Sequence, residues 1–186
     1  YGDITLATNT ILINLFTFFS YVSDGFAYAA EALTGKFTGA RDFVSLKDAV
    51  KKMFLWSFGI AVSYVIIYAL FTAEILQIFA PQDSEAGLNI LESAKQQSIW
   101  IILVPLVGFA PFLMDGILIG ATRTRVLRNS MFFSALLFFG LYFTLSNFIG
   151  STALWLSFII FLSSRGILQL IMTNKLNILY EPLPNK

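Results

Sequence analysis

The sequence contains neither cysteine nor histidine among its 186 residues. Without cysteine there is no disulfide framework and no thiolate nucleophile, and without histidine there is no bis-histidine haem. The usual zinc sites also need one or both of these residues. These absences exclude most classes of membrane metalloenzyme, and we expect the protein to have no cofactor and no metal site.

Charge is scarce as well. Only 12% of the residues are charged and 57% are hydrophobic, which gives a mean hydropathy of +0.76. An ordinary soluble domain carries about 25% charged residues. The net charge is +1, and the basic residues form short clusters beside apolar stretches, so nothing indicates a nucleic-acid partner. The composition indicates a membrane protein whose partner is the lipid bilayer.

Five apolar stretches are long enough to cross a hydrocarbon core of ~30 Å, which takes roughly 20 residues. They cover residues 4–33, 53–73, 99–121, 131–148 and 152–172. We therefore expect an all-α polytopic bundle of about five transmembrane helices. The expected helices cover residues 4–40, 46–78, 96–122, 127–148 and 152–174, and residues 81–97 are expected to form a loop with at most a weak interfacial helix.

The basic residues predict the topology. Ten of the twelve lie between the first and second stretches, between the third and fourth, or after the fifth, whereas residues 74–95 are mainly acidic and residues 147–151 are uncharged. By the positive-inside rule, the N-terminus of this chain lies outside and the C-terminus is cytoplasmic, in a multi-pass protein of the cell (inner) membrane. Because the sequence begins at Tyr1 and shows no signal-peptide pattern, we expect it to be part of a longer protein.

The third apolar stretch contains an acid, Asp115, together with Pro105 and Pro111. An ionised carboxylate there costs several kcal/mol unless a partner, a cavity or a proton compensates it. Each proline lacks an N–H and is expected to bend the helix, and such bends are tolerated at membrane depth where they are buried in protein or face water. Asp115 is the first candidate for a proton or sodium carrier. The alternative is a structural hydrogen bond or a salt bridge to Arg165.

The first helix carries a polar stripe at alternating steps of four and three residues. It consists of Thr10, Asn14, Thr17, Tyr21, Asp24, Tyr28, Glu31 and Gly35. A stripe with two acids must face protein or water, so we expect it to line a cavity for a cation or substrate, with the tyrosines able to stack on a cationic compound. The alternatives are that both acids are solvated near the cytoplasmic surface and that the tyrosines only pack. Arg165 and Gln169 lie one turn apart in the fifth stretch, and Arg165 is the expected charge partner of one of the acids.

Two segments carry a family resemblance: DGFAYAAEALTGKFTGARD, residues 24–42, and DGILIGATRTRVLRNSM, residues 115–131. Together they resemble the carboxy-terminal lobe of the multidrug and toxic compound extrusion (MATE) family, in its DinF-like branch. That family builds twelve helices as two six-helix lobes, and this chain resembles helices eight to twelve, without the amino-terminal lobe and the seventh helix.

The resemblance implies secondary active export of small organic, often cationic, compounds in exchange for H⁺ or Na⁺ by alternating access. The missing amino-terminal lobe would be a partner of this chain. Asp115 is similar in position to an acid on the tenth helix that couples cations in the NorM-like branch. In the DinF-like branch the coupling acid lies on the first helix, which this sequence does not include.

Two other functions share some of these sequence features. A lipid-linked precursor flippase of the same superfamily needs a basic cavity for pyrophosphate, but the polar stripe is acidic. An intramembrane aspartyl protease needs two membrane acids, which Asp24 and Asp115 supply. However, a glycine follows each acid here, in place of that family's glycine-rich motif. We therefore expect a transporter and not an enzyme.

Overall fold

The computed structural model describes residues 2–79 and 84–175, and these form five helices. The helices are α1 (Asp3–Gly39), α2 (Phe43–Phe79), α3 (Glu85–Gly120), α4 (Thr124–Ile149) and α5 (Thr152–Lys175). The predicted all-α fold is confirmed, and all five helices are long and apolar enough to cross a membrane. The start of the predicted 81–97 loop and the basic residue Lys186 lie outside the described residues.

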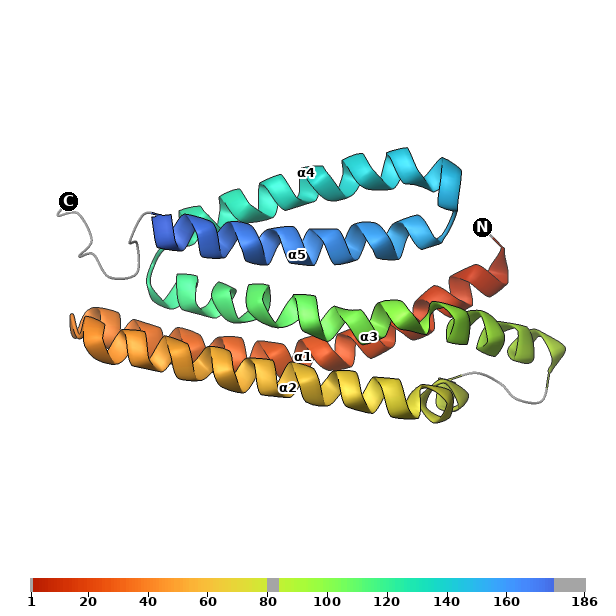
Figure 1. Ribbon diagram of the computed structural model, residues 1–186, viewed down its shortest axis with the longest axis horizontal. Helices are drawn as coiled ribbons and strands as arrows, with labels where there is room; N and C mark the ends of the chain where they lie inside the picture. The colour runs from red at the N-terminus through yellow and green to blue at the C-terminus, as the bar shows by residue number, and fades with distance from the viewer. Residues whose placement is uncertain (1, 80–83, 176–186) are drawn as a thin grey trace.

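Helix α3 lies at the centre of the bundle. In Figure 1 it runs between the pair α1 and α2 on one side and the pair α4 and α5 on the other, and consecutive helices are antiparallel. More than half of the most apolar part of α3 is buried, compared with 6% for α4. A residue on α3 therefore contacts the other helices more readily than a residue elsewhere in this chain.

The start of α3 differs from the prediction. The helix begins at Glu85, not near residue 96, so most of the expected loop is helical. Ser84 caps it, because its hydroxyl oxygen accepts a hydrogen bond from the Gly87 N–H at 3.1 Å. The apolar stretch alone could not reveal this polar first part, since only the cap and the local helix propensity mark it.

Helices α1 and α3 end in the same way. Arg41 and Thr122 adopt left-handed φ angles of 56° and 57°, and the following N–H groups bond back to the carbonyls of Phe37 and Leu118. These turns place the α1–α2 and α3–α4 connections at one end of the bundle, here called the basic end. The clusters of lysine and arginine found in the sequence are at that end. The side of the membrane that the basic end faces remains a prediction from the positive-inside rule.

Asp42 begins α2 at the basic end. Its carboxylate oxygen Oδ1 accepts a hydrogen bond from the Ser45 N–H at 3.0 Å. The hydrogen bonds from Ser45, first its hydroxyl and then its backbone N–H, hold the pKa of Asp42 below its ordinary value. The third acid of the 24–42 motif is therefore a helix cap rather than a group of the bundle interior.

Candidate functional site

The contact between α1 and α3 depends on two glycines placed four residues apart. A Cβ atom added at Gly116 would lie 2.0 Å from the carbonyl oxygen of Ala27, and one at Gly120 would lie 2.3 Å from that of Glu31. No side chain fits there, so the two backbones touch, as in the small-residue contacts of membrane helices. The sequence interpretation missed this contact, although the Gly-x-x-x-Gly spacing marks it.

The contact between α3 and α5 depends on a proline and a glycine. A Cβ atom at Gly166 would lie 3.0 Å from Cδ of Pro111, which is buried, as is Pro105. Helix α3 runs through both prolines as one element, so the predicted bends remain a prediction. Asp115 follows Pro111 by about one turn and precedes Gly116 directly. It is thus placed between two close helix contacts.

Both carboxylate oxygens of Asp115 are bonded to α5. Arg165 donates from Nη2 to Oδ2 and forms an ion pair, and Gln169 donates from Nε2 to Oδ1 at 2.8 Å. The side chains of Arg165 and Asp115 are only 11% and 21% exposed. The predicted charge partner is therefore present, and it compensates the acid's burial. Gln169, which the sequence placed one turn from Arg165, completes the group.

Two atoms of this group are not satisfied. Nε of Arg165 and Oε1 of Gln169 are buried and have no hydrogen-bond partner among the described residues, and the whole Gln169 side chain is buried. Buried polar atoms without partners are uncommon, because each costs about 1–3 kcal/mol. Arg165 can therefore donate, and Gln169 can accept, one more hydrogen bond than the structure shows.

Asp24 is a half-buried candidate acid on the part of α1 that packs near Asp115. The contact of Gly116 with Ala27 explains the proximity, because Ala27 follows Asp24 by about one turn and Gly116 follows Asp115 directly. We call Asp24, Asp115, Arg165 and Gln169 the charge cluster.

The rest of the polar stripe is more open. Tyr21 and Tyr28 are each 71% exposed, and Asn14 is exposed. Glu31 is half-buried, and its backbone lies against Gly120. These side chains lie opposite the face that α1 buries against its neighbours, so within the described residues the stripe is a surface rather than a closed cavity.

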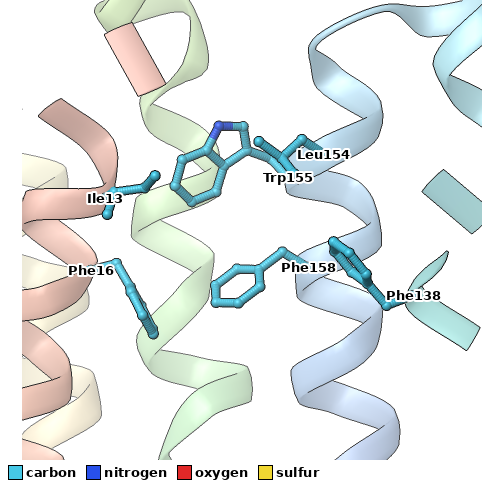
Figure 2. Close-up of a pocket in the computed structure, with 6 residues that line it drawn as sticks. All are labelled: Ile13, Phe16, Phe138, Leu154, Trp155 and Phe158. Atoms are coloured by element: carbon cyan, nitrogen blue, oxygen red, sulfur yellow. The ribbon is translucent and has the colours of Figure 1, made fainter. Parts of the chain in front are cut away.

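A cavity of about 190 Å³ lies between α1, α4 and α5. Figure 2 shows side chains from these three helices around it, and its lining residues are Ile13, Phe16, Phe138, Leu154, Trp155 and Phe158. The rings of Phe16 and Phe158 are perpendicular with centroids 5.0 Å apart, and Trp155 donates from Nε1 to Oδ1 of Asn9 at 2.9 Å. The sequence did not predict this cavity, because its lining comes from helices far apart in the chain.

The cavity contains none of the predicted acids. It is nevertheless linked to the charge cluster through α5, since Phe158 and Arg165 are seven residues apart and thus lie on the same face, about 10 Å apart along the axis. An aromatic cavity and a charged group therefore follow one another along one helix face.

Five apolar helices packed around an internal ion pair define a polytopic helical membrane protein. The MatE family profile matches residues 1–144. The chain is also 36% identical over 166 residues to DNA damage-inducible protein F of Escherichia coli strain K12, in an alignment that covers 89% of this chain and 35% of that protein. The chain therefore belongs to the MATE family, and the resemblance seen in the two motifs is confirmed.

The chain spans about a third of the length of the curated relative that it matches. No solved structure matches it at a significant level.

Proposed function

We propose that this chain is the carboxy-terminal lobe of a secondary active exporter, which moves small organic, often cationic, compounds out of the cell in exchange for H⁺ or Na⁺. Family membership supports export by the complete protein. Alternating access would rock this lobe against an amino-terminal lobe, with the N-terminus of this chain outside and its C-terminus in the cytoplasm.

The observation that carries the proposal is the bonding of Asp115. It is the only acid in α3 after Glu92, and its two oxygens tie the central helix to α5. An ion that binds the carboxylate competes with these bonds for the same oxygens. Removing one side of a buried ion pair costs about 3–5 kcal/mol, so this competition has a large effect. The charge state of Asp115 thus controls how firmly α3 and α5 are held together, which couples ion binding to helix movement.

The aromatic cavity supports an organic substrate. Its six lining residues are apolar, and five of its ring or alkyl groups come from α1 and α5, the helices that also carry Asp24 and Arg165. Drug-sized ligands usually occupy about 300–1,000 Å³, so this cavity suits the aromatic part of a larger compound. A cationic group on the same compound would be attracted to Asp24.

The two rival functions receive less support. A protease dyad needs two carboxyl groups that share a proton, but both oxygens of Asp115 are bonded to α5. A flippase for a pyrophosphate lipid needs free cationic groups in its cavity, but the guanidinium of Arg165 is paired with Asp115. Both arguments favour the exporter.

The first prediction concerns ion-driven efflux. In the complete protein reconstituted into proteoliposomes, Asp115→Asn should lower dye efflux driven by an imposed H⁺ or Na⁺ gradient by at least about tenfold, because the ion-binding carboxylate is gone. Asp48→Asn is the matched control. Asp48 pairs with Lys52 at 2.7 Å on the exposed basic end, so its loss should leave efflux unchanged. Wild-type rates and pH dependence in Asp115→Asn would remove this residue from the mechanism.

A further inference from the structure

The two α5 side chains that hold Asp115 differ in what they can do when its carboxylate takes up a proton. A guanidinium has only donors, so Arg165 can bond the carboxylate but has nothing to accept a proton from the acid. An amide has both a donor and an acceptor. Gln169 uses Nε2 now, while its buried Oε1 has no hydrogen-bond partner in the described part of the chain. After the amide turns over, Oε1 can accept from the acid's O–H.

A guanidinium released from Asp115 needs another acid nearby, since an unpaired buried charge is costly. Asp24 on α1 precedes Ala27 by about one turn, and the backbone of Ala27 touches Gly116, the residue directly after Asp115. Glu31, also on α1, lies against Gly120, nearer the basic end. Helix α2 has no charged side chain between Lys52 and Glu74, and α4 has none after Arg128.

The remaining titratable groups near these helices are tyrosines. Tyr21 and Tyr28 are on α1, Tyr64 and Tyr68 are on α2, and Tyr142 is on α4. A tyrosine is uncharged near neutral pH and cannot replace a carboxylate as a counter-ion. Asp24 is therefore the acid that is best placed to receive Arg165.

We propose that Arg165 is a mobile counter-ion, which pairs with Asp115 while that carboxylate is ionised and moves to Asp24 when Asp115 takes up the coupling proton, with Gln169 then bonding the protonated acid. This inference rests on the proposed role of Asp115 in ion coupling, and it commits that role to a proton. Arg165, the most deeply buried of the charged groups in the charge cluster, is paired in both states, and the half-buried Asp24 carboxylate is the one without a partner while Asp115 is ionised.

The donors around Asp115 favour a proton over sodium. A proton needs one lone pair of the carboxylate, whereas a sodium ion needs several oxygen ligands, and both oxygens of Asp115 already accept hydrogen bonds from α5. A sodium ion on Asp115 would also face the guanidinium. Two like charges in direct contact inside a protein repel strongly, because the effective dielectric constant there is much lower than in water.

The transfer would replace an ion pair between α5 and α3 with an ion pair between α5 and α1. With Arg165 on Asp115, α5 is joined to α3. With Arg165 on Asp24, α5 is joined to α1. The side chains of α1 and α5 already meet through the Trp155–Asn9 hydrogen bond, but in the described residues no Cα atom of α1 lies within 8 Å of a Cα atom of α5, so the new ion pair would draw the two backbones closer. Protonation thereby selects between two discrete packing arrangements, as a coupled transporter requires.

The test is a titration of Asp115 in the complete protein in lipid vesicles, read by the infrared band of its protonated carboxyl group. The band is assigned as the one that Asp115→Asn removes. Arg165→Gln should raise the proton affinity of Asp115 at least about tenfold, and Asp24→Asn should lower it by about tenfold or more, because the released guanidinium then has no partner.

The double variant decides between transfer and simple repulsion of two acids. If Arg165 moves to Asp24, the effect of Asp24→Asn should largely disappear when Arg165→Gln is also present. If Asp24 only repels Asp115, Asp24→Asn should lower the proton affinity of Asp115 at least as much when Arg165→Gln is present as when it is absent. That second result would overturn the proposal. So would an unchanged titration in Asp24→Asn.

A second measurement does not depend on an Arg165 variant folding. The guanidinium NMR signal of Arg165 should stay in slow exchange with water after Asp115 is protonated, and Asp24→Asn should abolish that protection. Protection that is independent of Asp24 would overturn the transfer. Neither experiment needs transport. Wild-type efflux in Asp115→Asn would therefore refute the proposed function. The infrared titration and the NMR measurement test the movement of Arg165 independently of that result.

Discussion

At the scale of residues, the account depends on how a carboxylate is tolerated on a central membrane helix. The two carboxylate oxygens of Asp115 are bonded to a guanidinium and an amide from α5, and these groups compensate the cost of burying the acid. The sequence could predict that Asp115 needs a partner, and it offered Arg165 as one, because few other charges lie within the apolar stretches. It could not show that Gln169 shares the acid or that Asp24 is close, since both depend on how three helices pack.

Losing the guanidinium should destabilise the protein. Arg165→Gln leaves a mostly buried carboxylate without its counter-ion, and the free energy of unfolding should fall by about 3 kcal/mol or more. Adding Asp115→Asn to that variant should restore most of the loss, because no charge is then left unpaired. The measurement is reversible unfolding of the complete protein in mixed detergent micelles. Equal losses in the single and double variants would show that the pair contributes nothing specific.

At the scale of helices, the site is positioned by backbone contacts. Gly116 and Gly120 bring α3 against α1, and Gly166 brings α5 against Pro111. The sequence predicted the apolar stretches well because composition alone shows them. The α3 start at Glu85 escaped prediction because its first turns are polar and are marked by the Ser84 cap. Which faces meet also escaped prediction, since lipid-facing and protein-facing surfaces of a membrane helix are both apolar.

The glycine contact makes a sharp prediction. Gly116→Ala puts a methyl group 2.0 Å from the Ala27 carbonyl oxygen, so α1 and α3 must separate, at a cost of about 1–3 kcal/mol in the free energy of unfolding. Gly140→Ala on α4 is the matched control, because nothing lies within 4 Å of its added Cβ. That variant should be neutral or slightly stabilising, since alanine favours a helix over glycine. The same unfolding assay compares the two, and equal stability would contradict the contact.

At the scale of the whole molecule, the chain is a five-helix unit with a central helix and one basic end. Its membrane character could be predicted from composition, and its family from two short motifs that the comparisons confirm. The aromatic cavity could not be predicted, because Ile13, Phe138 and Phe158 come from three separate helices. The exposed polar stripe of α1, with Tyr21 and Tyr28, is a surface that the remainder of a complete transporter would be expected to face.

The central claim is that Asp115 binds the coupling ion, and with a proton as that ion we expect the binding of an organic cation to make Asp115 release it. The most direct measurement adds such a cation to the complete protein in weakly buffered detergent solution and records the pH. Wild type and Asp48→Asn should both release protons as the compound binds, because the acid ionises to balance its charge. Asp115→Asn should bind without that release. The account is contradicted if Asp115→Asn releases as many protons as wild type, or if wild type binds the compound and releases none.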